Sequence, residues 1–280
     1  MKKVLLLLLI PTLFLSIIYI FKLNNEDNSV ILNEIEVKEE DSNINPTINE
    51  TPEVTNNIKI YVEKPAKLNA TYFEKIIKVN NDYAYLSYPL KINTELPPKI
   101  IVYGHGSNTT VINSFSSPFM KDLQLYGEYF SKRGYVFLAP NFKNYTTNKT
   151  DWINQITDLK KTITNNYLID DQINLIGYSK GAQPIMYYSI SYPQLVNSVA
   201  LLAPALNVYS NSDILKTKSI KFQIWHGNSD VNVPYSVSTD LVKQYNSLKL
   251  KNISLITLNG KGHFDIDTEY ISDIYKFFQK

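Results

Sequence analysis

A serine between two glycines is the first group in this chain that could do chemistry. Residues 177–181 read Gly-Tyr-Ser-Lys-Gly, which places Ser179 directly after a short apolar run at residues 173–176 and ahead of a helix-compatible segment. A strand, a sharp turn and a helix form the setting in which this spacing exposes a serine hydroxyl as a nucleophile. The two glycines are expected because side chains at 177 and 181 would collide with the neighbouring strand and helix.

A serine hydroxyl barely ionises by itself, so it needs a base, and the sequence offers a base and an acid downstream. Asp230 follows an expected strand at residues 220–224, and His263 follows another at residues 253–258. The histidine can take the proton from Ser179, and the carboxylate can hold the imidazole in the required tautomer. The chain order serine, aspartate, histidine therefore predicts a catalytic triad.

Two other histidines and a second aspartate could fill the same roles. His105 and His226 both precede a glycine at the end of an expected strand, where a ring packs or bonds to the backbone. Asp213 is also near in sequence, but Asp230 has the Val-Pro context that follows at residues 233–234. These comparisons favour His263 as the base and Asp230 as the acid.

Three ordered motifs carry a resemblance to a known family. The glycine–serine–glycine motif, the pattern His-Gly-x-x-Asp-x-x-Val-Pro at residues 226–234 and the Gly-His pair at residues 262–263 lie between residues 70 and 280. This part of the chain resembles the α/β-hydrolase superfamily, most nearly its dienelactone-hydrolase-like and serine-esterase branch. The resemblance implies a metal-free serine hydrolase that needs no cofactor and forms an acyl-enzyme, with carboxylic esters as substrates.

The same resemblance implies where an oxyanion would be held. One donor would be the backbone N–H of Lys180, directly after the nucleophile. The second would be the backbone N–H of Ser107, which follows the Gly-His-Gly run at residues 104–106. Each such donor is worth about 2.7–4 kcal/mol in the transition state.

The elements that must position these residues alternate along the chain. Strand patterns at residues 57–62, 72–79 and 82–89 predict an antiparallel start. Further strands at 99–103, 135–139, 173–176 and 196–202 alternate with helices at 123–132, 152–167, 236–248 and 268–278. This alternation predicts an α/β fold with a mostly parallel sheet and helices on both faces. The short interval between residues 206 and 220 leaves no room for more than a turn or a short helix, so little or no cap is expected.

The amino terminus predicts a membrane anchor. Lys2 and Lys3 precede an apolar run at residues 4–21, which would be about 27 Å long as a helix and could just cross a bilayer. The positive residues should stay in the cytoplasm, so the rest would be translocated. Residues 1–23 are thus expected to be an uncleaved, single-pass signal anchor in the cell membrane, with a cleaved signal peptide and a secreted protein as the alternative.

Residues 24–56 have the composition of a disordered linker, with nine acidic residues against one lysine and with prolines at 46 and 52. The hydrolase domain is expected at residues 57–280. Its basic excess is spread out, which argues against a nucleic-acid partner. The chain has no cysteine, and this excludes disulfides and a thiolate nucleophile.

Three functions stay open on the sequence alone. The first is a carboxylic-ester hydrolase acting on a small-molecule or polymer-attached ester, which an uncapped site would admit. A peptidase or acyltransferase of the same fold would share the triad and differ in substrate or acyl acceptor. A non-catalytic binding protein would keep the fold without an activated serine.

Overall fold

The structure of the protein is a computed structural model. The described residues are 67–68, 71–79, 82–90, 97–106, 112, 115, 120–142, 148–166, 169–266 and 268–280. The expected anchor at residues 1–23, the expected linker at 24–56 and the expected strand at 57–62 lie outside these ranges. No described helix is both long enough and apolar enough to span a membrane.

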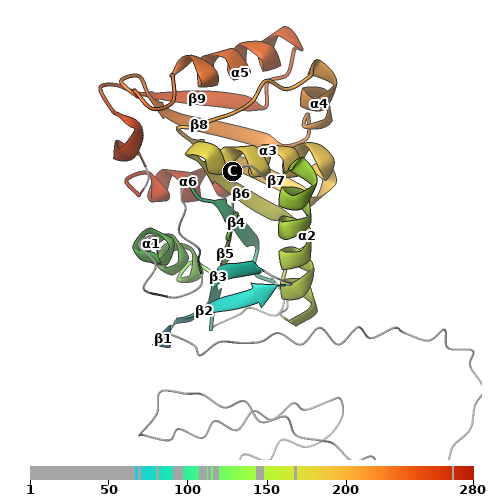
Figure 1. Ribbon diagram of the computed structural model, residues 1–280, viewed down its shortest axis with the longest axis vertical. Coiled ribbons are helices and arrows are strands. Elements are labelled where there is room, and N and C mark those ends of the chain that lie inside the picture. Colours follow the sequence, from blue (N-terminus) through green and yellow to red (C-terminus); the bar gives the residue numbers. More distant parts are fainter. Residues whose placement is uncertain are drawn as a thin grey trace, which may run out of the picture. The chain divides into compact units, whose positions relative to one another are not determined.

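The described residues form a nine-stranded sheet in the order β1-β2-β3-β5-β4-β6-β7-β8-β9 (Figure 1). Its strands are β1 Lys67–Leu68, β2 Tyr72–Val79, β3 Asp82–Pro89, β4 Ile100–Gly104, β5 Val136–Pro140, β6 Ile173–Tyr178, β7 Val196–Leu202, β8 Lys221–Gly227 and β9 Ile253–Leu258. The first three strands and the β3–β5 pair are antiparallel, whereas β5, β4 and β6 to β9 run parallel. The predicted antiparallel start and parallel centre are both confirmed.

Helices cover both faces of this sheet (Figure 1). They are α1 Met120–Ser131, α2 Lys149–Asn166, α3 Ala182–Ser191, α4 Asn211–Lys216, α5 Ser236–Ser247 and α6 Ile271–Phe278. The apolar residues of α2, α3, α4 and α5 share one buried cluster, and those of α1 and α6 share the other. The central strands β4, β5 and β6 are buried along their whole length, as expected for parallel strands covered on both sides.

Local signals explain where the helices differ from their predicted bounds. The helix α2 begins at Lys149, three residues before the predicted Trp152, because the Asn148 side chain accepts a hydrogen bond from the N–H of Asp151 at 3.0 Å and caps the helix. The last helix begins at Ile271 and not at 268, because residues 268–270 form a turn. Pro184 is the third residue of α3, where backbone N–H groups lack intrahelical partners anyway, and α3 continues to Ser191.

The segment between β7 and β8 holds only the six-residue helix α4. The prediction that this interval carries no cap is therefore confirmed. The carboxyl ends of the parallel strands lie at one edge of the sheet. The predicted site residues follow β4, β6, β8 and β9 at this edge. A functional site at this edge is the general expectation for a parallel α/β sheet.

Candidate active site

Ser179 stands at the sharp turn that follows β6. Its φ angle is +52°, a left-handed backbone conformation that a residue with a side chain rarely adopts. The turn continues as a single 3₁₀ turn, Ser179–Gly181, which leads into α3. Strain of this kind persists only where surrounding structure enforces it, and here it presents the hydroxyl above the sheet edge.

The two flanking glycines are required by close backbone approach. A Cβ at Gly181 would lie 2.1 Å from the carbonyl oxygen of Gly104, and a Cβ at Gly177 would lie 2.6 Å from the Cα of Ala182. Both distances are far below a van der Waals contact. The predicted steric reason for the two glycines is confirmed at both positions.

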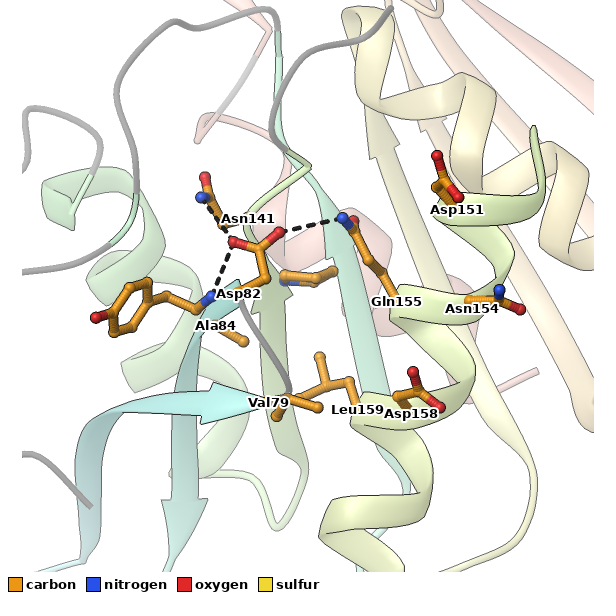
Figure 2. Close-up of a pocket in the computed structure, with 11 residues that line it drawn as sticks. Val79, Asp82, Ala84, Asn141, Asp151, Asn154, Gln155, Asp158 and Leu159 are labelled. Carbon is orange, nitrogen blue, oxygen red and sulfur yellow. Dashed lines mark hydrogen bonds between the residues drawn. The ribbon is translucent and has the colours of Figure 1, made fainter. Parts of the chain in front are cut away.

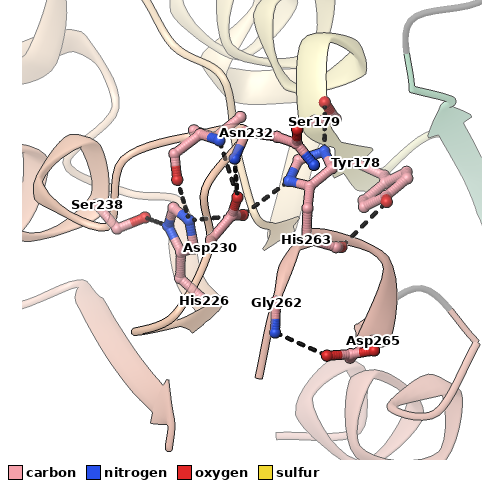
Figure 3. A network of polar contacts seen from close by, with 10 residues as sticks. Tyr178, Ser179, His226, Asp230, Asn232, Ser238, Gly262, His263 and Asp265 are labelled. Atoms are coloured by element: carbon pink, nitrogen blue, oxygen red, sulfur yellow. Dashed lines mark hydrogen bonds and ion pairs between the residues drawn. The ribbon is translucent and has the colours of Figure 1, made fainter. Parts of the chain in front are cut away.

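His263 meets the Ser179 hydroxyl directly. It opens a short 3₁₀ turn, His263–Asp265, after β9, and its Nε2 lies 3.0 Å from Ser179 Oγ (Figure 3). Both side chains are buried. The Ser179 hydroxyl can therefore donate its proton to His263 Nε2, which is the geometry required of a general base.

Asp230 lies on the opposite side of the His263 ring. The Nδ1–H of His263 donates to Asp230 Oδ2 at 2.7 Å, and the backbone N–H groups of Asn232 and Val233 donate to Oδ1 at 2.8 Å each (Figure 3). Burial alone would raise the pKa of this carboxyl, but those N–H groups and His263 hold the pKa below its usual range. Asp230 is thus an ionised, fully bonded carboxylate.

Tyr178 supports His263 from the strand side. Its hydroxyl donates to the carbonyl oxygen of His263 at 3.1 Å, and the two rings stack with centroids 5.4 Å apart. The middle residue of the glycine–serine–glycine motif therefore also orients the base. The motif alone carries no signal for this contact.

His226 was predicted to pack or to bond to the backbone, and that interpretation is incomplete. Its Nε2 does lie 3.1 Å from the Val233 carbonyl oxygen, but it also lies 3.2 Å from Asp230 Oδ2, while Nδ1 lies 2.7 Å from Ser238 Oγ (Figure 3). The other histidine behaves as predicted, because His105 Nδ1 bonds to the carbonyl oxygen of Gly106 at 2.8 Å. The signal in the sequence was the place of His226 at the start of the His-Gly-x-x-Asp-x-x-Val-Pro pattern, four residues before Asp230.

A cavity of about 610 Å³ opens over Ser179 and His263. Apolar and polar groups both line it: Gly106, Asp122, Tyr178, Lys180, Ala205, Asn232, Val233, Phe264 and Thr268. Phe264 is 80% exposed, so this side of the cavity is open to solvent. The predicted oxyanion donor Lys180 is the residue after Ser179 at the cavity wall, whereas Ser107 lies outside the described residues.

A second, smaller cavity of about 290 Å³ lies between β3, the end of β5 and α2 (Figure 2). The Asp82 carboxylate in its wall accepts hydrogen bonds from the Asn141 and Gln155 side chains at 3.1 Å each and from the Tyr83 N–H at 2.9 Å. Asp151 and Asp158 also line it. Among the described residues, no group of three or more histidine, cysteine or acidic side chains could hold a metal ion.

The fold and the serine–histidine–aspartate arrangement define an α/β-hydrolase. Residues 136–280 match the model of the Phospholipase/Carboxylesterase family, and the chain belongs to that family. No curated protein sequence matches the chain significantly.

Solved structures share the fold at low sequence identity. A predicted CIB-like hydrolase from Thermoplasma acidophilum is 18% identical with a TM-score of 0.56, covering 79% of this chain and 99% of its own. Est1E from Butyrivibrio proteoclasticus is 17% identical with a TM-score of 0.54, covering 74% and 97%. A dienelactone hydrolase-like promiscuous phosphotriesterase from metagenomic libraries is 12% identical with a TM-score of 0.52, covering 69% and 79%. These structures show that the chain has the α/β-hydrolase fold, as its sequence resemblance implied.

Proposed function

We propose that this protein is a serine carboxylesterase in which Ser179, His263 and Asp230 are the catalytic residues. The observation that carries the proposal is the unbroken chain of hydrogen bonds from Ser179 Oγ through both nitrogens of His263 to Asp230, at 3.0 and 2.7 Å. Ser179 on its strained turn and the buried base His263 line an open cavity, and the ionised Asp230 lies on the far side of the His263 ring. The family supplies the reaction class, and esters of carboxylic acids are its substrates.

The reaction proceeds in two halves. In the first, Ser179 Oγ attacks the ester carbonyl carbon while His263 Nε2 takes the hydroxyl proton, and the imidazolium then gives that proton to the departing alkoxide. The product alcohol leaves and an acyl group stays on Ser179. In the second half, His263 takes a proton from water, the resulting hydroxide attacks the acyl-enzyme, and Ser179 regains its proton as the acid leaves. Asp230 remains ionised throughout and stabilises the His263 cation.

The tetrahedral intermediates need donors for their oxyanion. We assign the first donor to the backbone N–H of Lys180. The support is its position directly after Ser179, in the turn Ser179–Gly181 that leads into the amino terminus of α3. That helix end carries a partial positive charge, which favours a developing negative charge. We assign the second donor to the N–H of Ser107, on the basis of its position after the Gly-His-Gly run.

An open cavity suits a bulky ester. The interval between β7 and β8 contributes only α4, and Phe264 stands exposed at the mouth. Tyr178 and Val233 offer apolar surface beside Ser179 for an acyl or alcohol group. We therefore include small-molecule esters and esters carried on a polymer among the substrates.

We further propose that residues 1–23 anchor the protein in the cell membrane and that residues 24–56 link this anchor to the hydrolase domain at 57–280, outside the cytoplasm. The support is the apolar run behind Lys2 and Lys3 and the acidic composition of the linker. Protease added to intact cells should degrade the domain. Protection of the domain, with cleavage only after lysis, would overturn this orientation, and release into the medium would favour the secreted alternative.

Covalent labelling tests the enzyme mechanism. A fluorophosphonate probe should label the full-length chain and should not label Ser179→Ala. Ser189→Ala is the matched control, since Ser189 is a fully buried serine of α3 whose hydroxyl donates to the Ile185 carbonyl oxygen, and this variant should label like the wild type. The wild type should also hydrolyse p-nitrophenyl acetate and butyrate. An unlabelled, folded wild type would support the binding-protein alternative, and turnover of aminoacyl p-nitroanilides alone would support a peptidase.

A further inference from the structure

Asp230 is held by more donors than a triad requires. Its Oδ1 accepts two backbone N–H groups, and its Oδ2 accepts His263 Nδ1–H. The same Oδ2 lies 3.2 Å from Nε2 of His226, four residues earlier at the end of β8. One carboxylate oxygen therefore lies between two histidine rings (Figure 3).

The surroundings of His226 determine which of its nitrogens carries the proton. Its Nε2 faces two acceptors, Asp230 Oδ2 and the Val233 carbonyl oxygen at 3.1 Å, and neither of these can donate. A lone pair at Nε2 would be repelled by both oxygens, so Nε2 must carry hydrogen. In the neutral ring Nδ1 then accepts a hydrogen bond from the Ser238 hydroxyl at 2.7 Å.

Burial keeps this ring in that state. The His226 side chain is fully inaccessible to solvent, and burial lowers the pKa of its imidazole. Its titratable neighbours are Asp230, His263 on the far side of that carboxylate, and Tyr235, whose ring meets it edge-on at 5.5 Å. The proton that His263 gains during catalysis adds a further positive charge nearby, which also disfavours protonation of His226.

We infer that His226 is a positioning residue for the reaction: its Nε2–H fixes Oδ2 of Asp230 in the plane of the His263 ring. This inference rests on the proposed function, and His226 acts only through Asp230. A carboxylate can rotate about its side-chain bonds, and a rotated Oδ2 would leave His263 Nδ1–H without its partner. The His226 bond resists that rotation and also takes a share of the carboxylate charge.

Paired substitutions separate this role from simple packing. His226→Phe keeps a ring and removes the donor, whereas His226→Gln retains an N–H group that can reach Asp230. Tyr235→Phe is the control, since it alters the same wall of the site and leaves the donor in place. Ester hydrolysis by each full-length variant is measured as kcat and KM from pH 5 to 9, beside thermal unfolding.

The expected result is a loss in kcat of about tenfold or more for His226→Phe, with KM little changed, because a hydrogen bond to a charged group is removed. The acidic limb of its pH profile should move to higher pH, since a carboxylate without this donor holds the His263 proton more firmly. His226→Gln should recover most of the rate, and Tyr235→Phe should behave like the wild type. Equal losses in the Phe and Gln variants, or an unchanged Phe variant, would overturn the inference.

A spectroscopic experiment decides the same question without turnover. The chain has only three histidines, so ¹⁵N-histidine labelling of the full-length protein gives few ring signals. His226 should remain the Nε2–H tautomer from pH 5.5 to 8, and its Nε2–H proton should shift in Asp230→Asn. An Nδ1–H tautomer, or an Nε2–H signal indifferent to Asp230→Asn, would refute the hydrogen bond even in an active enzyme. Conversely, an inactive wild type with the expected tautomer would refute the proposed function alone.

Discussion

Tyr178 and His263 are joined twice, by a hydrogen bond of 3.1 Å from the tyrosine hydroxyl to the histidine carbonyl oxygen and by stacking of their rings at 5.4 Å. The two contacts hold both the backbone and the imidazole of the base. Because Tyr178 immediately precedes Ser179, the nucleophile and its base are supported by the same strand end. Positioning of His263 is therefore built into β6 as well as into β9.

Removing only the hydroxyl should reveal the first of these contacts. Tyr178→Phe should lower the free energy of unfolding by about 1 kcal/mol, the value of one typical hydrogen bond, and should lower kcat a few-fold while the stacked ring stays. Chemical denaturation and ester kinetics measure both effects. Tyr187→Phe is the control, because the Tyr187 hydroxyl accepts an exposed hydrogen bond from the Asn207 side chain at 3.2 Å. Equal behaviour of the two variants would contradict a role for the Tyr178 bond.

Asp230→Asn should lower kcat by about 10⁴-fold, the scale known for this change in a serine protease triad. The reason is the hydrogen bond that Asp230 Oδ2 accepts from His263. In the variant an amide would face His263 Nδ1 either with its NH₂ group, which is a donor, or with an oxygen that carries no charge. The labelling rate with fluorophosphonate and kcat on p-nitrophenyl acetate measure the loss.

The matched control for that change is Asp213→Asn on α4. Asp213 was the competing candidate for the acid, and it bonds to Lys216 at 2.7 Å and to Ser210 at 2.9 Å. Its variant should keep full activity. A large loss in Asp213→Asn together with an active Asp230→Asn would reverse the assignment of the acid.

The strained backbone at Ser179 should be measurable as stability. Ser179→Gly should be more stable than Ser179→Ala by about 1 kcal/mol, because glycine adopts the φ of +52° without the steric cost of a Cβ. Neither variant has the hydroxyl, so the comparison isolates the backbone. At Ser189, inside α3, the glycine variant should instead be less stable than the alanine variant by a similar amount. Urea unfolding of all four variants gives the comparison, and the same order at both sites would mean that Ser179 is unstrained.

Stability should fall in mild acid because two histidines are buried in the neutral form. Burial lowers the native-state pKa of His226 and of His105. Below about pH 6.5 the unfolded chain therefore binds protons that the native protein does not bind. The stabilisation is complete above that pH and is lost as the pH falls, by at most about 1.4 kcal/mol per pH unit for each histidine.

Urea unfolding of wild type and His226→Gln from pH 5 to 8 tests this. The variant should show a shallower slope, because one of the two titrating groups is gone. An unchanged slope would mean that His226 is protonated alike in both states. The lowered pKa of Asp230 adds a further loss of stability only below about pH 4.

Much of the fold and the triad could be predicted because their signals are local. The bounds of β2 and β3 follow alternating side chains, and the structure places them at the predicted residues. Ser179, Asp230 and His263 each follow a strand-like run, and parallel strands bring such positions to one sheet edge. The fold class and the triad were therefore predictable from order and spacing, whereas the reaction class was implied by the resemblance to α/β-hydrolases.

The rest depended on loop geometry that spacing does not specify. The loop after β8 folds back so that the Val233 carbonyl oxygen and Asp230 both lie at Nε2 of His226. The pattern of residues 226–234 does not specify this loop conformation. The early start of α2 depended on a capping side chain, Asn148, outside the amphipathic pattern used to place the helix. The orientation of individual rings and caps thus depends on tertiary contacts that the sequence pattern does not specify.

The strand that delivers the base lies at the border of the sheet. Among the described strands, β9 pairs only with β8, and most of its side chains are partly or fully exposed, with Leu258 alone buried. Such a strand can open locally at a lower free energy than the whole domain. His263 would then move away from Ser179 while the nucleophile and the acid stayed in place. On heating, the protein would lose activity reversibly at a temperature below that of global unfolding. The loss of activity would then measure the local opening of β9.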